Sequence, residues 1–265
     1  MKKLALITGA SSGLGREITK ELALQGFDTI ASARREELLR ELAGSINGGS
    51  YKTFSGTDIK SVLELANHTT QRFFDGNYNS LTVVAAADMH EKAVVEENGK
   101  KRYTTRQDFS EEYIRNSRML SVVSPMLLYA SLAPKVSNLN FLYVSSQAAN
   151  KDFWSKGNSI YGRNKRSAEQ SFEDFKDVYS LRFGFIDTEM AEDLLKQLEG
   201  IEPFVHIDND LTKPLKPKEE LFLPVKKVAQ DIVGFVDNKN DFEKVYSNVY
   251  SYNAKPSKEL YQKYK

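Results

Sequence analysis

The sequence predicts an α/β protein in which helices cover both faces of a doubly wound parallel sheet. The first observation is that short apolar runs alternate with longer amphipathic segments, a rhythm typical of parallel strands joined by right-handed crossovers. The second is size, since 265 residues with 40% hydrophobic residues suit a single domain, residues 1–265, with a substantial core. Together they predict one α/β domain.

Strand and helix candidates succeed one another from the first residues. Each strand candidate is a short, mostly apolar run bounded by polar or turn-forming residues. The helix candidates are amphipathic, and the first repeats Ile18 and Leu22 at helical spacing. In chain order the predicted elements are strand 4–7, helix 16–24, strand 28–33, helix 36–43, strand 51–54, helix 61–73 and strands 81–86, 140–144 and 178–183.

Two stretches depart from this alternation. Residues 88–113 form a charged insertion in which Asn98-Gly99, between apolar flanks, indicates a β-hairpin, with a solvated loop as the alternative. Residues 190–225 end in a part rich in Asp, Lys and Pro, at a place where such folds usually carry a substrate cover. A plain surface insertion is the alternative for this second stretch.

Composition excludes several classes of function. The chain has 37 Lys and Arg against 36 Asp and Glu, so its net charge of +1 gives no sign of a nucleic-acid or anionic membrane partner. It has no cysteine, which excludes disulfides, thiolate metal sites and cysteine nucleophiles, and we expect no metal site. No apolar run reaches the roughly 18 residues that a membrane span needs. We therefore expect a cytoplasmic protein.

A glycine-rich turn follows the first predicted strand directly and leads into the first helix. Glycine permits tight turns and close backbone approach, and the unpaired N–H groups at a helix start attract a pyrophosphate. At the first strand of an alternating chain this turn predicts a dinucleotide site, with a purely structural turn as the alternative. The residues expected to contact the cofactor are Gly9, Ser11, Ser12, Gly13, Leu14 and Gly15.

The end of the second predicted strand indicates which dinucleotide is bound. Folds that select NAD place an acidic residue there to hold the ribose 2′-hydroxyl, whereas this chain has Ala33 followed by Arg34 and Arg35. A guanidinium pairs well with a 2′-phosphate, which a carboxylate would repel. The sequence therefore favours NADP(H), with Arg34 as the 2′-phosphate ligand. The alternative is that both arginines only begin a solvated helix.

A tyrosine and a lysine, Tyr161 and Lys165, lie four residues apart and would share one face of a helix. The ammonium would stabilise the phenolate and lower the phenol pKa from about 10 towards the range useful for proton transfer. Upstream, strand 140–144 ends in Ser145-Ser146, where a hydroxyl would hydrogen-bond a substrate oxygen as it gains charge. An exposed helix is the alternative for the Tyr–Lys pair alone.

In this order and spacing, the glycine turn, the serine pair and the Tyr161–Lys165 pair resemble the short-chain dehydrogenase/reductase family in its compact, single-domain Rossmann form. The resemblance extends to about Val236. It implies that Ser146 positions and polarises the substrate, that Tyr161 transfers the proton, and that Lys165 lowers the tyrosine pKa and binds the ribose of the cofactor. Tyr161 and Lys165 therefore count both as catalytic and as cofactor-binding residues.

The same resemblance implies further cofactor contacts at Asp58, Ile59, Ala86, Ile186 and Thr188. Asp58 matches the acid that contacts the adenine, with Ile59 beside it, and Ala86 would act only through its backbone. Ile186 and Thr188 match the segment that holds the nicotinamide carboxamide. For Asp58 the alternative is a helix N-cap, and a capping role for Thr188 is compatible with a cofactor contact.

The chain departs from the family pattern at several positions. Ala85-Ala86-Ala87-Asp88 stands where the family usually has Asn-Asn-Ala-Gly, and Ser121 falls where an asparagine kinks a long helix and holds a proton-relay water. Serine can also hold a water, with fewer hydrogen-bonding groups, so we count Ser121 among the catalytic residues. Phe153 and Trp154 either line the substrate pocket or pack a longer loop. The tail lacks the glycine-rich last strand of many tetramers, so a homodimer is more compatible with the sequence.

These features predict an NADPH-dependent oxidoreductase that reduces a ketone or aldehyde to an alcohol, or catalyses the reverse, on a small-molecule substrate. One alternative is a nucleotide-sugar epimerase or dehydratase, whose larger relatives share the Tyr–Lys spacing but have a different glycine spacing and a bigger C-terminal domain. A second is an NADP-binding regulatory or scaffold protein without turnover, which the lost asparagines at positions 85, 86 and 121 leave open.

Overall fold

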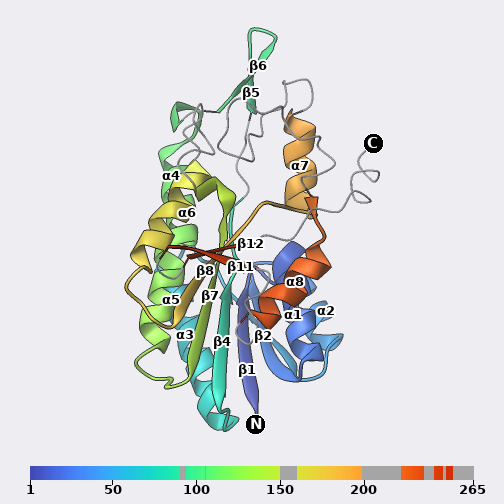
Figure 1. The fold of residues 1–265 in the computed structure, drawn as a ribbon, viewed down its shortest axis with the longest axis vertical. Helices are drawn as coiled ribbons and strands as arrows, with labels where there is room; N and C mark the ends of the chain where they lie inside the picture. Colours follow the sequence, from blue (N-terminus) through green and yellow to red (C-terminus); the bar gives the residue numbers. More distant parts are fainter. Residues whose placement is uncertain are drawn as a thin grey trace.

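The computed structural model describes residues 1–89, 94–104, 106–149, 160–198, 222–235, 242–246 and 249–252. Its centre is an eight-stranded sheet with the order β11-β12-β8-β7-β4-β1-β2-β3 (Figure 1). Seven strands run parallel, and β11 (Phe242–Tyr246) is antiparallel to its neighbour. The parallel strands are β1 (Lys3–Thr8), β2 (Phe27–Ala33), β3 (Gly49–Thr53), β4 (Ser80–Ala85), β7 (Leu139–Ser146), β8 (Val178–Phe183) and β12 (Val249–Tyr252).

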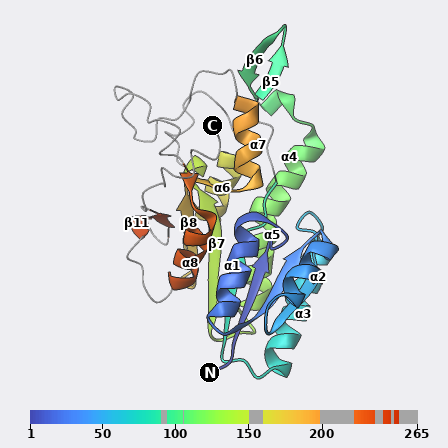
Figure 2. The same ribbon diagram turned by 90° about the vertical axis from the view of Figure 1, so that its right-hand side faces the viewer.

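Helices cover both faces of the sheet, which confirms the doubly wound fold (Figures 1 and 2). One face carries α1 (Gly13–Leu24), α2 (Glu36–Gly44) and α8 (Val225–Gly234), and the other carries α3 (Ile59–Asp75), α5 (Ser124–Leu132) and α6 (Ile160–Ser171). The predicted strands and helices of the first half match these elements to within two residues at each end, apart from the start of α1.

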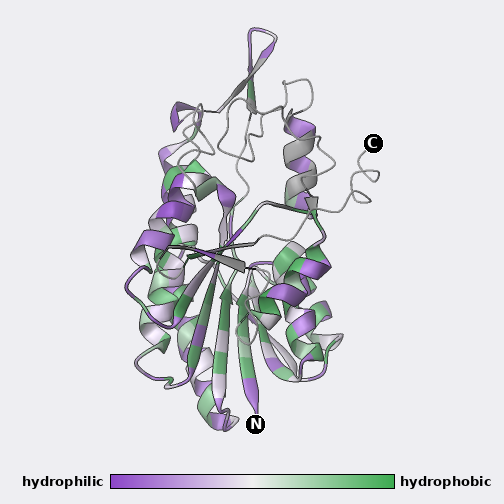
Figure 3. Ribbon diagram, viewed as in Figure 1, coloured by the Kyte–Doolittle hydropathy of each residue, from purple (hydrophilic) through white to green (hydrophobic). Residues whose placement is uncertain are grey.

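Two hydrophobic cores lie on opposite faces of the sheet, because side chains alternate along each strand. In β1, Leu4 and Leu6 belong to the core beneath α3 and α5, whereas Ala5 and Ile7 belong to the core beneath α1, α2 and α8. Figure 3 shows hydrophobic colour along the central strands and hydrophilic colour on the outer sides of the helices. Burial on both faces explains why the strand runs are mostly apolar and do not alternate with polar residues throughout.

The β-hairpin that the sequence indicates in the first insertion is confirmed. Strands β5 (Val94–Glu97) and β6 (Lys100–Tyr103) pair antiparallel beyond the carboxyl ends of the central strands (Figure 1). Asn98 and Gly99 both have positive φ, 54° and 71°, as a two-residue turn between twisted strands requires. Helix α7 (Glu189–Leu198) stands at the same end of the molecule and belongs to the second insertion, of which residues 199–221 lie outside the described part.

A final parallel strand, β12, completes the sheet beside β8, although the sequence indicated no glycine-rich last strand. It has only four residues, Val-Tyr-Ser-Tyr, too short a run for its alternation to be recognised in a tail rich in tyrosine. Its pairing with β8, not a local sequence signal, makes it a strand. No helix in the described part of the chain is long and apolar enough to cross a membrane.

Candidate active site

The candidate site lies at the carboxyl edge of the sheet, where β1, β4 and β7 end side by side. Thr8 pairs with Ala85, and Ala85 pairs with Tyr143, so the segments that follow these strands leave the sheet close together. They are the glycine turn, the Ala86–Asp88 segment and the Ser145–Ser146 pair. In open α/β sheets ligands bind at this edge.

The glycine turn is closed so tightly that only glycine fits at two positions. Gly9 has φ +75°, and a Cβ there would lie 2.9 Å from the Ala86 carbonyl oxygen and from the Ala87 backbone. A Cβ on Gly15 would lie 2.5 Å from the Gly9 carbonyl oxygen. These positions bring the turn against the end of β4 and lead straight into α1, an arrangement that fits a bound pyrophosphate.

Arg35 contacts this turn directly, whereas the sequence pointed to Arg34. The Arg35 guanidinium donates to the Ser12 hydroxyl at 2.6 Å and to the Ser11 hydroxyl at 3.0 Å. Arg34 and Arg35 are both exposed, and the hydrogen bonds to the turn come from Arg35. The signal in the sequence was a pair of adjacent arginines, and only the path of the chain into α2 shows which one turns towards the glycine turn. Arg34 as a 2′-phosphate ligand stays a prediction.

The residues expected around the adenosine have identifiable positions in the fold. The Asp58 carboxylate accepts hydrogen bonds from the backbone N–H groups of Lys60 and Ser61, at 3.3 and 3.0 Å, so the N-cap interpretation is confirmed. Ile59 is exposed at the first turn of α3, and Ala86 packs against the hydrophobic core. Their contacts with a cofactor stay predictions.

The segment that carries Ile186 and Thr188 lies against the glycine turn. A methyl carbon of Thr188, Cγ2, lies 3.4 Å from where a Cβ on Gly13 would be. The segment is held by the pairing of β9 (Phe185–Ile186) with β10 (Phe222–Leu223) and by a 2.9 Å hydrogen bond from the Asp187 N–H to the Leu223 carbonyl. The structure thus brings the two predicted cofactor segments together.

Tyr161 and Lys165 share one face of α6, as their spacing predicts. The Lys165 Nζ lies 5.4 Å from the centre of the Tyr161 ring and 4.9 Å from that of Tyr143. Lys165 is only 2% exposed, and its ammonium donates to the Val144 carbonyl oxygen at 2.7 Å. The end of β7 therefore holds the lysine beneath the tyrosine ring.

The serine pair divides between the two faces of β7. Ser145 is buried and donates to the Glu169 carboxylate at 2.6 Å, and Glu169 forms a bidentate pair with Arg182 at 2.6 and 2.8 Å. Ser146 points the other way and accepts a 3.1 Å hydrogen bond from the Ala148 N–H. Strand alternation therefore assigns Ser145 to a buried polar cluster and leaves Ser146 as the candidate substrate contact. No local pattern along the chain predicts the Glu169–Arg182 pair.

The Ser121 hydroxyl is linked to the Lys165 ammonium through the carboxylate of Asp88, a residue to which the sequence pattern assigns no role. The Ser121 hydroxyl donates to Asp88 Oδ1 at 2.8 Å, and Asp88 Oδ2 lies 2.5 Å from Lys165 Nζ. The Asp88 and Lys165 side chains are 9% and 3% exposed. Burial alone would lower the pKa of Lys165, but the Asp88 carboxylate, with the phenols of Tyr143 and Tyr161, outweighs it and raises that pKa.

The irregularity that the resemblance placed at Ser121 is a π-helical turn, Met119–Val123, between α4 (Glu111–Arg118) and α5. The Tyr143 hydroxyl donates to the Ser121 carbonyl at 2.9 Å within this turn. Such turns often occur at functional sites, because they redirect backbone groups without ending the helix. Phe153 and Trp154, the other residues considered for the pocket, lie outside the described residues.

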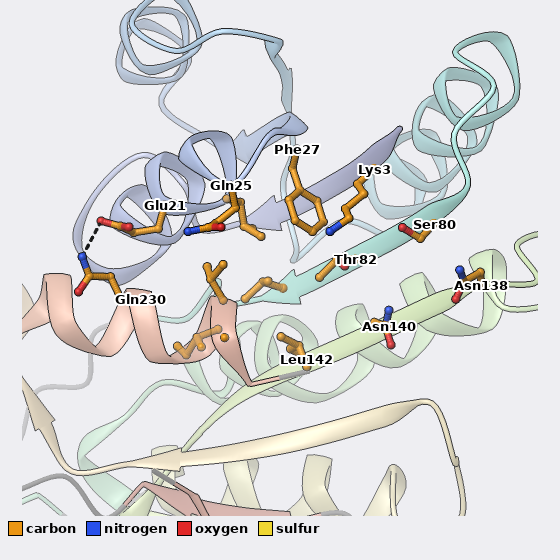
Figure 4. A pocket seen from close by; sticks show the side chains of 15 residues that line it. Lys3, Glu21, Gln25, Phe27, Ser80, Thr82, Asn138, Asn140, Leu142 and Gln230 are labelled. Atoms are coloured by element: carbon orange, nitrogen blue, oxygen red, sulfur yellow. Dashed lines mark hydrogen bonds between the residues drawn. The ribbon is translucent and has the colours of Figure 1, made fainter. Parts of the chain in front are cut away.

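A separate cavity of about 370 Å³ lies near the opposite edge of the sheet, between α1, α8 and the starts of the central strands. Figure 4 shows Lys3, Ser80 and Asn138 at its strand side, and a 3.4 Å hydrogen bond from Gln230 to Glu21 joins the two helices beside it. Because the glycine turn and Lys165 lie beyond the other ends of these strands, this cavity is distinct from the candidate site.

Comparison with known proteins supports the family resemblance. A family model described as short chain dehydrogenase matches residues 3–199. The NADPH-dependent 1-acyldihydroxyacetone phosphate reductase of Saccharomyces cerevisiae is 47% identical over 64 residues, 24% of this chain and 21% of that protein. A very-long-chain 3-oxoacyl-CoA reductase of Pyricularia oryzae is 45% identical over 51 residues, 18% and 15% of the two chains. The chain therefore aligns with only a minor part of the length of these relatives.

Solved structures resemble the whole fold. An alcohol dehydrogenase from Thermococcus sibiricus, complexed with 5-hydroxy-NADP, superposes with a TM-score of 0.68 at 19% identity, over 96% of this chain and 97% of its own. A short-chain dehydrogenase from Streptomyces avermitilis has a TM-score of 0.67 at 21% identity, over 95% and 88% of the two chains. Since the family model covers the sheet from β1 through β8, with the glycine turn and α6, the chain belongs to the short chain dehydrogenase family.

Proposed function

We propose that this member of the family is an NADPH-dependent reductase that converts a ketone or aldehyde to an alcohol, or catalyses the reverse reaction. The observation that carries the proposal is the placement of the buried Lys165 beneath the Tyr161 ring, at the same sheet edge as the glycine turn. An acid–base pair beside a dinucleotide cradle is the arrangement that hydride transfer with proton transfer needs.

The cofactor preference rests on charge at the end of β2. The glycines let the turn pack against the end of β4, where a Cβ would clash with backbone atoms, and Arg35 places a guanidinium beside Ser11 and Ser12. No acidic residue stands at Ala33, the position that would hold a ribose 2′-hydroxyl. Arg35, with Arg34 beside it, would hold the 2′-phosphate. NADPH, when bound, supplies the hydride for the carbonyl carbon.

The chain's own residues supply the proton. The Tyr161 hydroxyl would donate its proton to the carbonyl oxygen as that oxygen gains negative charge. The Ser146 hydroxyl would donate a hydrogen bond to the same oxygen and orient it. Lys165, fixed by the Val144 carbonyl, would hold the phenol in place and bind the ribose of the cofactor. In the reverse direction the Tyr161 phenolate would accept the proton from the alcohol.

The test is turnover of NADPH by purified protein with a panel of ketones, diketones and aldehydes. The panel includes 1-acyldihydroxyacetone phosphate and 3-oxoacyl-CoA, because two relatives that match part of this chain are named as reductases of these compounds. Tight NADPH binding without turnover of any compound would instead favour the NADP-binding regulatory or scaffold function. The ion pair between Lys165 and Asp88 departs from the family pattern. This departure is the observation that favours the second candidate function.

A matched variant tests the role of Tyr161. Tyr161→Phe keeps the ring above Lys165 and removes only the hydroxyl, so it should lower turnover by roughly 10²-fold or more, the contribution typical of positioned proton transfer. NADPH binding, followed by fluorescence titration, should remain close to that of the unmodified protein. Retention of most of the activity would contradict the acid–base role.

A further inference from the structure

Asp88 is held in one position by three contacts. Its Oδ1 accepts hydrogen bonds from the Ser121 hydroxyl and from the Met89 backbone N–H, both at 2.8 Å. Its Oδ2 faces the Lys165 ammonium at 2.5 Å. The family pattern described above has glycine here, so this carboxylate is an addition to the expected site and not a substitute for an expected acid. The contacts bring it there from the end of β4, with Ser121 supporting it from the π-helical turn.

The ammonium of Lys165 has three N–H groups, and this carboxylate changes how they are used. One N–H donates to the Val144 carbonyl oxygen, and the ammonium also forms an ion pair with Asp88 Oδ2. A ribose hydroxyl and the Tyr161 oxygen would share the ammonium with these two partners. The lysine is therefore fixed more firmly, and shared among more partners, than the Tyr–Lys spacing alone implies.

Asp88 also changes the charge that Tyr161 experiences. A lone ammonium near a phenol favours the phenolate, but a carboxylate in contact with that ammonium cancels much of its field. Among the charged residues that the structure describes, Glu169 and Arg182 form their own buried pair at 2.6 Å. Burial raises the pKa of Tyr143, and the Lys165 ammonium offsets only part of that effect. Within the described part of the chain, Asp88 is thus the carboxylate in contact with the ammonium that lies beside the Tyr161 ring.

We propose that Asp88 is a positioning residue that holds the Lys165 ammonium in place and offsets its charge, so that Tyr161 remains a protonated phenol through neutral pH. The inference rests on the proposed reductase function, and it deepens it. A protonated Tyr161 is the form that donates a proton during carbonyl reduction, whereas alcohol oxidation needs the phenolate. Asp88 therefore biases the site towards reduction near neutral pH.

The direct test is titration of the Tyr161 phenol in cofactor-free protein with ¹³C-labelled tyrosine rings, observed by NMR. Tyr161→Phe identifies the resonance. In the unmodified protein the pKa should lie near or above the value of about 10 for free tyrosine. In Asp88→Asn, which keeps the side-chain shape and removes the charge, the pKa should fall by roughly one to three units. A Tyr161 pKa close to neutrality in the unmodified protein, or no fall in Asp88→Asn, would overturn the proposal.

Two further variants separate this effect from others. Asp75→Asn removes the same charge from the exposed carboxyl end of α3 and should leave the Tyr161 pKa unchanged. Ser121→Ala removes a hydrogen bond to Asp88 but no charge, and should shift that pKa less than Asp88→Asn does. A shift as large in either variant would contradict the charge explanation.

The pH profile of carbonyl reduction provides a second readout. Its alkaline limb should move down in Asp88→Asn together with the Tyr161 pKa, and an unmoved limb despite a shifted pKa would contradict the assigned bias. The titration needs neither cofactor nor substrate, so it tests the coupling even if no tested carbonyl is reduced. Failure of the reductase proposal and failure of this one are therefore distinguishable.

Discussion

Arg35 shows how a single side chain connects cofactor choice to the glycine turn. Its guanidinium donates to both serine hydroxyls of the turn, and these hydrogen bonds distinguish it from the neighbouring Arg34, which is also exposed. A 2′-phosphate placed here would receive charge-assisted hydrogen bonds from Arg35, and NADH would lack this contact. Substituting the two arginines one at a time should therefore have different effects on NADPH binding.

Arg35→Ala should weaken NADPH binding by roughly 10- to 100-fold, corresponding to the loss of hydrogen bonds to a charged group. NADH binding should change much less, because that cofactor has no 2′-phosphate. Arg34→Ala is the matched comparison and should have the smaller effect, since the hydrogen bonds to the serines of the turn come from Arg35. Fluorescence titration with both cofactors measures all four affinities, and a larger effect of Arg34→Ala would restore Arg34 as the principal ligand.

At the scale of an element, the glycine turn depends on close backbone contact. A Cβ on Gly15 would lie 2.5 Å from the Gly9 carbonyl oxygen, a distance that backbone atoms do not tolerate. Gly15→Ala should therefore displace the turn, weaken NADPH binding at least several-fold and lower the melting temperature. Gly44→Ala, at the end of α2 where a Cβ meets nothing within 4 Å, is the matched control and should bind NADPH normally. Normal binding by both variants would refute the close-contact argument.

Helix α6 and strand β8 are joined by a buried ion pair. Glu169 is fully buried, the Arg182 side chain is 8% exposed, and Ser145 donates to the same carboxylate. Arg182→Met leaves the Glu169 charge buried without its guanidinium, so the free energy of unfolding should fall by about 3–5 kcal/mol. The exposed pair of Arg40 and Glu36 is the control, and Arg40→Met should leave the free energy of unfolding nearly unchanged. Equal losses in urea denaturation would contradict this ranking.

At the scale of the whole molecule, stability should depend on the protonation of His68 in α3. Burial, together with the positive charges of Lys52 and Arg72, lowers the pKa of His68 below its ordinary value of 6.5. The unfolded chain therefore takes up this proton at a higher pH than the folded protein does. The His68 contribution to stability is present above about pH 6.5 and is lost as pH falls through the folded-state pKa.

Urea denaturation at pH 7.5 and 5.5 measures this effect. The free energy of unfolding should be lower at the acid pH in the unmodified protein, and His68→Gln should reduce the difference between the two values. If the variant shows the same pH dependence as the unmodified protein, other groups are responsible.

The sheet as a whole explains why the site forms where it does. Parallel strands that pair in register end at one edge, so the glycine turn after β1, Asp88 after β4 and the serines of β7 meet there. Helix α6 then brings Tyr161 and Lys165 over the end of β7. The residues of the site come from separate parts of the chain, and the common strand direction is what collects them.

Much of this could be predicted from the sequence, because the signals are local. Strand and helix periodicity, the glycine turn and the four-residue spacing of Tyr161 and Lys165 each depend on neighbouring residues and on backbone geometry. The sequence by itself therefore determined the fold class, the carboxyl edge as the place of the site, and the shared face of the Tyr–Lys pair.

Only the tertiary structure decided which distant side chains meet. The pairing of Asp88 with Lys165, the turn of Arg35 towards Ser12, and the Glu169–Arg182 pair join residues on different elements. The short strand β12 likewise exists through its partner β8. Such contacts depend on how the elements pack and on which side-chain rotamers that packing allows, and no periodicity along the chain encodes them.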